Sequence, residues 1–414
     1  MWFGGDVRAR RGLRPRSDPA LLLSTGCYRS WCSDSSLIGE VDVVAGRGDL
    51  SRHRVSRPSV LVGLVTLAAG LVAPLCDGVV AAQYAVGSAD QRIDVGVDAR
   101  IELFSVLERL AGRPEYGVAA TPYARAVDEW FGPYADDPAV VTFRELVSSH
   151  GIAFDAAMTL AAQLDEDLAP VRPLTPLPEG LDRRWEGVDL VSVLYEVTEF
   201  ASTTRFDEFM ASQHEYVSAV EDEFGLFVAS RPVLDWFDGV FGVRGSAGYH
   251  VVPGLLTGLM SFGVRAGADE IYAIMSLEAP DQAGIPALGL LTEEYLVHEL
   301  AHSYVNPVVR EHVERFDGPS PALDAAARAM EEQHYPTREI VVQESIVRAL
   351  TVLYLREAVG IEAANSSLEN QIRLGFVWTL DLVLALDAAI QAGDGTLTDE
   401  LMIDAAARVL MPAG

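Results

Sequence analysis

The chain has 414 residues, half of them hydrophobic and 22% charged, so it can bury the core of one large domain or two smaller ones rather than remain disordered. Its 31 basic residues, all of them arginine, stand against 60 acidic residues, a net charge of −29. So acidic a chain is a poor partner for nucleic acid or for an anionic membrane surface.

The first 57 residues differ from the rest of the chain. They hold ten arginines against six acidic residues, together with Gly, Ser and Pro, and they show no sustained hydrophobic period. We predict that 1–57 is disordered, or that it is not translated and that the true start lies near Val55.

Residues 58–82 show the three parts of a secretory signal. Arginines precede an uncharged apolar run from Val60 to Leu75, and small residues after Val80 suit cleavage. The pattern predicts either a signal peptide, with a mature chain that starts near Gln83, or a signal anchor that stays in the membrane. Both place the carboxy-terminal part outside the cytoplasm, because the arginines stay inside.

Cysteine usage limits the chemistry of the mature chain. The three cysteines, Cys27, Cys32 and Cys76, all precede the proposed cleavage point. The mature part therefore has no disulfide and no thiolate ligand, so any metal in it must be held by nitrogen and oxygen. Ten arginines and seven acidic residues are lost before residue 83, which leaves 21 basic and 53 acidic residues.

Residues 83–168 are predicted to form an N-terminal helical part. Apolar residues recur at helical spacing in three stretches, and Gly112 and Gly151 suggest where the first two helices end. The three stretches are 99–112, 136–151 and 153–164. Four prolines in 169–184 predict a linker between this part and the remainder.

Residues 185–414 are predicted to be mainly helical with one modest sheet. The short stretches 248–256 and 270–280 are β-branched or aromatic and flanked by Gly and Pro, which is typical of strands. Amphipathic or apolar helices are expected at 188–202, 206–224, 340–360, 372–393 and 399–410. The expected fold class is therefore mainly helical α+β.

The sequence HELAHSYVNP, residues 298–307, is predicted to lie on a helix. Thr292 is a good N-cap, Glu293 and Glu294 suit the positive first turn, and Pro307 is expected to end the helix. A helix over 293–305 therefore places this motif near its middle, beside the expected sheet.

On that helix the motif has the residue types of a catalytic zinc site. His298 and His302, one turn apart, can present imidazole nitrogens to one ion. Glu299 is rotated by about 100° from His298, so it suits a general base that reaches the attacking water better than it suits a third ligand. The alternative is a pair of histidines hydrogen-bonded to backbone or water.

A catalytic zinc usually has three protein ligands and an open position for water. The candidates that follow the motif are His312, Glu332, His334, Glu339 and Glu344. Glu344 has the best physical case, because 340–355 is apolar nearly all round and its only charges are Glu344 and Arg348. Either Arg348 pairs with this carboxylate, or a metal takes it and Arg348 supports it. We favour the metal, since two histidines and a glutamate are the thermolysin-type ligand set.

Four stretches also resemble a known family. ARIELFSVLERLAGRPEY, GIAFDAAMTLA, HELAHSYVNP and ESIVRA, in this order, are similar to the bacterial domain of unknown function 4932 family, which is regarded as a group of gluzincin-type zinc metallopeptidases. The similarity spans about residues 90–390. It implies a zincin-like arrangement in which His298, His302 and Glu344 bind zinc and Glu299 is the catalytic acid–base.

The function expected from these features is that of a secreted zinc metallopeptidase acting on a peptide or protein substrate. Charge on the tetrahedral intermediate needs a donor besides zinc, and Tyr335, His334 and His250 are candidates by residue type. The alternative is a non-catalytic extracellular or cell-envelope binding protein with a structural or vestigial zinc site. The cleavage preference and the oligomeric state stay open.

Overall fold

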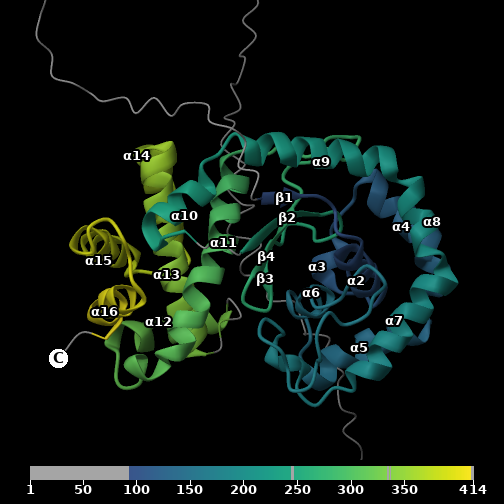
Figure 1. The fold of residues 1–414 in the computed structure, drawn as a ribbon, viewed down its shortest axis with the longest axis horizontal. Helices are drawn as coiled ribbons and strands as arrows, with labels where there is room; N and C mark the ends of the chain where they lie inside the picture. The colour runs from purple at the N-terminus through teal and green to yellow at the C-terminus, as the bar shows by residue number, and fades with distance from the viewer. Residues whose placement is uncertain (1–92, 244–246, 333–334, 336, 412–414) are drawn as a thin grey trace, which may run out of the picture. The chain divides into compact units, whose positions relative to one another are not determined.

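The computed structural model describes residues 93–243, 247–332, 335 and 337–411, which all belong to one compact unit. These residues are mainly helical and include a small sheet, so the predicted α+β class is confirmed (Figure 1). The predictions for 1–57 and for the signal at 58–82 fall outside the described residues. Within the described part of the chain, no helix has both the length and the apolar character that a membrane span requires.

The sheet has four strands in the order β1-β2-β4-β3. Their bounds are β1 Ile93–Val95, β2 Gly248–Gly254, β3 Phe262–Ala266 and β4 Glu270–Ser276. Strand β2 pairs in parallel with β1 and β4, whereas β3 pairs antiparallel with β4 and forms one edge. The two predicted strands are confirmed as β2 and β4, but β1 and β3 were not predicted.

The three helices predicted before the linker are present. They are α2 Ala99–Leu110, α5 Pro138–His150 and the short α6 Ala156–Ala161. Gly151 ends α5 with a φ of 68°, the left-handed conformation that glycine adopts without strain. Helices α3 Pro114–Gly117 and α4 Pro122–Phe131 were not predicted. Helix α2 packs against α5 and α6, and every residue from Ile101 to Glu108 is buried.

The helices after the linker agree with the prediction in part. Helix α7 Leu190–Thr204 is confirmed, but the helix expected at 206–224 is two helices, α8 Phe206–Ser212 and α9 His214–Ala229. Of the later predictions, α13 Arg338–Tyr354 continues through a π-helical turn at Leu355–Val359, α15 is Thr379–Ala392 and α16 is Asp399–Leu410. Helices α10 Val233–Phe241, α12 Pro321–Glu332 and α14 Ile361–Arg373 were not predicted.

The motif helix, α11, extends from Leu290 to Glu311 and is longer than predicted at both ends. Its N-cap is Gly289 rather than Thr292, and the Glu278 carboxylate accepts from the backbone N–H of both residues, at 3.3 and 3.1 Å. Pro307 lies inside the helix. Burial of the next turn, in which Val309 has 0% exposure, offsets the loss of the backbone hydrogen bond that proline cannot donate.

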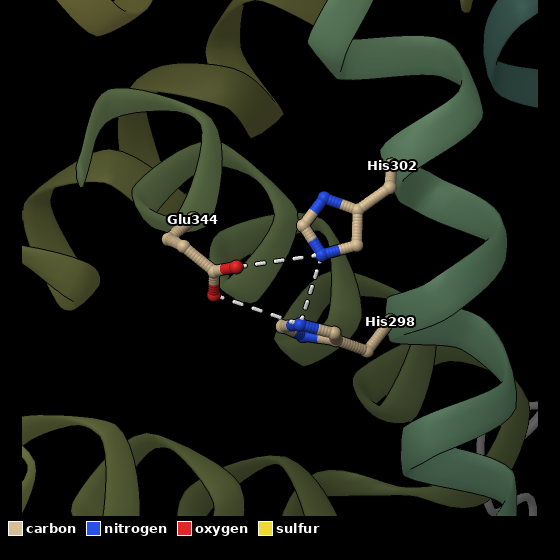
Figure 2. A group of neighbouring side chains, drawn as sticks. All are labelled: His298, His302 and Glu344. Atoms are coloured by element: carbon tan, nitrogen blue, oxygen red, sulfur yellow. Dashed lines mark hydrogen bonds and ion pairs between the residues drawn. The ribbon is translucent and has the colours of Figure 1, made fainter. Parts of the chain in front are cut away.

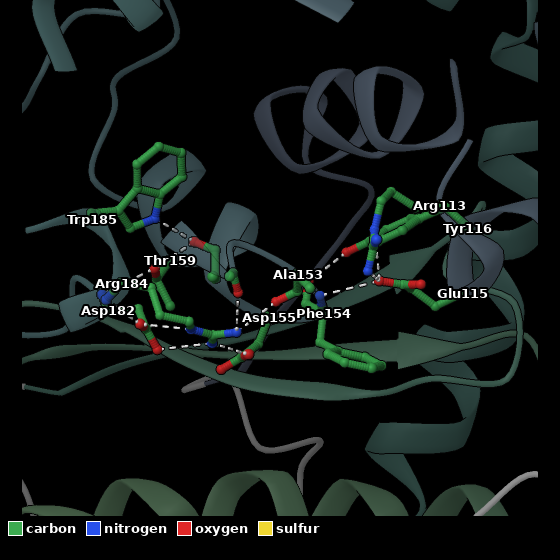
Figure 3. Close-up of polar contacts among 12 residues, drawn as sticks. Arg113, Glu115, Tyr116, Ala153, Phe154, Asp155, Thr159, Asp182, Arg184 and Trp185 are labelled. Carbon is green, nitrogen blue, oxygen red and sulfur yellow. Dashed lines mark hydrogen bonds and ion pairs between the residues drawn. The ribbon is translucent and has the colours of Figure 1, made fainter. Parts of the chain in front are cut away.

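The predicted linker, 169–184, follows the edge of the sheet. The Gly267 N–H donates to the Glu179 carbonyl at 3.0 Å, and Arg172 donates to the Ala266 carbonyl at 3.3 Å. The segment then ends in a polar cluster, where Arg184 lies 2.7 Å from Asp155 and 2.8 Å from the Asp182 carboxylate (Figure 3). This cluster joins the start of α6 to the end of the predicted linker.

Candidate metal centre

Helices α11 and α13 pack against each other, and three side chains converge between them (Figure 2). His298 and His302 project from one face of α11, as their one-turn spacing requires, and Glu344 projects toward them from α13. All three side chains are largely covered, with 15, 15 and 9% of their surface exposed. Burial of 340–355, predicted from its apolar composition, is confirmed for Val341–Tyr354.

The spacing of the three side chains fits a single ion. Nε2 of His298 and Nε2 of His302 lie 3.2 Å apart, and the Glu344 oxygens lie 3.6 and 3.5 Å from these two nitrogens. Ligands placed tetrahedrally about 2.0 to 2.2 Å from zinc are about 3.3 to 3.6 Å from one another. Among the described residues, His298, His302 and Glu344 are the one group of three or more His, Cys, Asp or Glu side chains close enough together to bind a single metal ion.

Both imidazoles are arranged to offer Nε2. Burial lowers the pKa of His298 to about 3, so its ring is neutral, as a metal-binding imidazole must be. Nδ1 of His302 lies 3.1 Å from the Asn306 amide oxygen, a contact that places the ring proton on Nδ1 and leaves the Nε2 lone pair free. Nitrogen and carboxylate ligands of this kind suit zinc.

Glu344 is ionised although it is buried. Burial acts to raise the pKa of this carboxyl, but Arg348, His298 and His302 outweigh it and hold the pKa below the usual value. Nη2 of Arg348 lies 3.0 Å from Oε2 of Glu344, so the ion pair considered from the sequence is present together with the histidine contacts. This contact is an ion pair without the angles of a hydrogen bond, so Oε2 keeps the capacity to bind a further partner.

Glu299 lies on α11 beside the three converging side chains and is buried, at 8% exposure. Burial raises the pKa of its carboxyl to about 7, against a smaller lowering by His302. Strand β3 approaches closely here, because a Cβ at Gly263 would lie 2.5 Å from the Glu299 carbonyl oxygen and 3.2 Å from Oε2. A carboxylate whose pKa is near neutrality suits a general base.

Two of the remaining third-ligand candidates make other contacts. Glu339 lies 3.6 Å from Arg310, and His312 caps the end of α11. The side chain of Glu332 and all of His334 fall outside the described residues.

Of the three candidates for a donor to the tetrahedral intermediate, the structure describes His250 and Tyr335. His250 lies on β2, where Nε2 contacts Glu270 at 2.7 Å and Nδ1 lies 3.6 Å from Asp94. Tyr335 accepts a hydrogen bond at 2.9 Å from Nη2 of Arg348, the same nitrogen that contacts Glu344. Tyr335 is therefore the predicted donor that the structure connects to the site.

Two supporting residues were missed by the sequence analysis. Asn306 stands four residues after His302, so helical spacing could have indicated it. Gln371, which accepts from Arg348 at 2.6 Å, lies on α14, a helix that the sequence pattern did not reveal.

Comparison with known proteins identifies the family. The model of one family, described as a domain of unknown function (DUF4932), matches residues 180–394, just over half of the chain. No curated protein and no solved structure matches. The matched region contains HELAHSYVNP and ESIVRA, whereas the stretches 99–116 and 151–161 precede it. The chain therefore belongs to the DUF4932 family of domains of unknown function.

Proposed function

We propose that the protein is a secreted zinc-dependent metallopeptidase that hydrolyses peptide bonds. The observation that carries this proposal is the separation of the His298, His302 and Glu344 ligand atoms, which matches three corners of a zinc tetrahedron. Three protein ligands leave a fourth position for water, the arrangement of catalytic rather than structural zinc sites.

The geometry supports a division of roles among these residues. His298, His302 and Glu344 would hold zinc, which supplies a water of lowered pKa and polarises the scissile carbonyl. Glu299, buried and adjacent to His298, takes the proton of the attacking water and returns it to the leaving amine. Helix α11, helix α13 and the edge strand β3 support a zincin-like arrangement, since they bring ligands, base and a strand edge together.

Secretion is the second part of the proposal, and it rests on the sequence of residues 58–82. The arginines before an uncharged apolar run, and the small residues after it, support export of the remaining chain. N-terminal sequencing of the exported protein tests this point. A start near Gln83 supports a cleaved signal, whereas a cytoplasmic protein that keeps this segment contradicts export.

Replacement of the base tests the catalytic role directly. Glu299→Gln should keep bound zinc but lose about 10²- to 10⁴-fold in peptide hydrolysis, because the ligands remain and the proton acceptor is lost. Glu311→Gln, an exposed change at the end of the same helix, is the matched control and should retain activity. The measurements are zinc content by elemental analysis and turnover of a peptide library.

Two outcomes separate the proposal from its alternative. If both variants and the wild type hydrolyse peptides equally, Glu299 is not the base. If the wild type binds one zinc per chain but cleaves no member of the library, the non-catalytic binding protein is the better account.

A further inference from the structure

A buried cation lies directly beside the proposed third ligand. Arg348 follows Glu344 by one turn of α13, is 9% exposed, and places Nη2 3.0 Å from Oε2 of Glu344. A positive charge this close to a metal site repels the ion that the site is built to hold. Neutralising the charge of Glu344 therefore does not by itself explain why Arg348 lies at this position.

Arg348 is held from three other directions. Nη1 donates to the Gln371 side-chain oxygen at 2.6 Å, and Nη2 donates to the Tyr335 hydroxyl at 2.9 Å. The guanidinium also lies over the Phe376 ring, 4.5 Å from its centroid. These contacts from separate segments prevent the guanidinium from moving away when an ion binds.

The fixed guanidinium makes the two carboxylate oxygens unequal. Oε2 lies between Arg348 at 3.0 Å and Nε2 of His298 at 3.6 Å, whereas Oε1 lies 3.5 Å from Nε2 of His302. An ion that binds Oε2 must share that oxygen with the guanidinium, but an ion that binds Oε1 lies farther from the positive charge. Coulomb repulsion therefore favours Oε1.

We propose that Arg348 is a positioning residue that holds Oε2 of Glu344 and makes this glutamate a one-oxygen ligand, which keeps the fourth coordination position open for water. The inference rests on the proposed zinc site and deepens it. Without Arg348, both oxygens approach the ion and the second oxygen fills the water position. Arg348 then acts on the reaction only through Glu344.

X-ray absorption spectroscopy of the zinc-loaded wild type tests the inference without any variant. The expected spectrum is that of four-coordinate zinc with two imidazoles, one carboxylate oxygen and one further oxygen. Five-coordinate zinc with both Glu344 oxygens bound overturns the inference and leaves the proposed function standing. A wild type that binds no divalent cation overturns both.

Cobalt substitution provides the variant test. Arg348→Met should bind Co²⁺ with a weaker visible absorption than the wild type, because five-coordinate Co²⁺ absorbs less than four-coordinate Co²⁺. Arg356→Met, which removes a cation paired with Asp387 farther along the chain, is the matched control and should keep the wild-type spectrum. A wild-type spectrum in folded Arg348→Met overturns the inference.

The conservative variant separates positioning from simple stabilisation. Arg348→Lys keeps the charge but cannot reach Glu344, Gln371 and Tyr335 together. The inference expects this variant to restore thermal stability relative to Arg348→Met while its cobalt spectrum stays changed. Full recovery of the four-coordinate spectrum by lysine would show that a positive charge alone suffices and would contradict a positioning role for the arginine side chain.

Discussion

The contact between His302 and Asn306 shows how the site depends on a residue outside the HExxH pattern. The Asn306 amide oxygen, 3.1 Å from Nδ1, selects the ring tautomer that leaves Nε2 available. The sequence could predict His298, Glu299 and His302 because helical geometry alone relates them, and Glu344 because an unpaired buried carboxylate is costly. It could not predict that Gln371 and Tyr335 also bind Arg348, because these two residues lie on other segments of the chain.

Replacement of Asn306 tests this orienting contact. Asn306→Leu removes the acceptor for Nδ1–H, so the affinity for zinc should fall about 10- to 100-fold while the fold is kept. Asn365→Leu, an exposed change on α14, should leave the affinity unchanged. Competition with a chromophoric chelator measures both constants. Equal affinities for the two variants would show that Asn306 does not orient His302.

At the scale of the elements, strand β3 and helix α11 meet at a point where only glycine fits. A Cβ at Gly263 would lie 2.5 Å from the carbonyl oxygen of Glu299, closer than real side chains approach backbone. The sequence did not indicate β3, because its FGVRA pattern contains glycine and arginine instead of an apolar run. The sequence also placed the end of α11 too early. The helix continues past Pro307 because burial of the following turn outweighs the tendency of proline to end a helix.

Gly263→Ala is therefore expected to separate β3 from α11 and to displace Glu299. Peptide hydrolysis should fall by about 10-fold or more, and the free energy of unfolding should fall by about 1 to 3 kcal/mol. Gly225→Ala, inside α9 where an added Cβ meets nothing within 4 Å, should instead raise the unfolding free energy by about 0.5 to 1 kcal/mol. Urea unfolding and turnover check both. If Gly263→Ala has the unfolding free energy and the activity of the wild type, β3 does not approach α11 so closely that only glycine fits.

Helix α2 carries a buried acid that makes stability depend on pH. Burial raises the pKa of Glu102 from 4.5 to about 8, so the folded chain keeps a proton that the unfolded chain loses. Its contribution to stability is complete below about pH 4.5 and is lost as pH rises through about 8, at about 1.4 kcal/mol per pH unit.

Glu102→Gln should remove this slope, because glutamine is neutral at every pH. The difference in unfolding free energy between wild type and variant should therefore change between pH 5 and pH 8 in favour of the variant. Glu129→Gln, an exposed change on α4, should show no such difference. Parallel slopes for wild type and Glu102→Gln would show that this carboxyl is ionised in the folded protein.

At the scale of the whole described unit, the proposed ion joins α11 to α13, two helices whose ligands are 42 residues apart from His302 to Glu344. Only the folded chain brings them together, so binding must stabilise it. The general class, mainly helical with a small sheet, followed from apolar periodicity. Helix α10 was missed because it has only 9 residues, and α14 was missed because its buried residues, Ala364, Ser367 and Gln371, are small or polar and give no apolar period.

Zinc should therefore raise the unfolding free energy by about 2.7 kcal/mol when its free concentration is about 100 times the dissociation constant. Thermal denaturation with zinc and with a chelator measures this shift, and His298→Ala should abolish it. A shift that persists in His298→Ala would mean that zinc binds elsewhere.

The most direct test of the metal centre is an anomalous-difference map at the zinc absorption edge, from crystals of the purified protein. The account predicts one peak within about 2.0 to 2.2 Å of Nε2 of His298, Nε2 of His302 and a carboxylate oxygen of Glu344. A peak at another set of side chains, or none between α11 and α13 in crystals soaked with zinc, would contradict it.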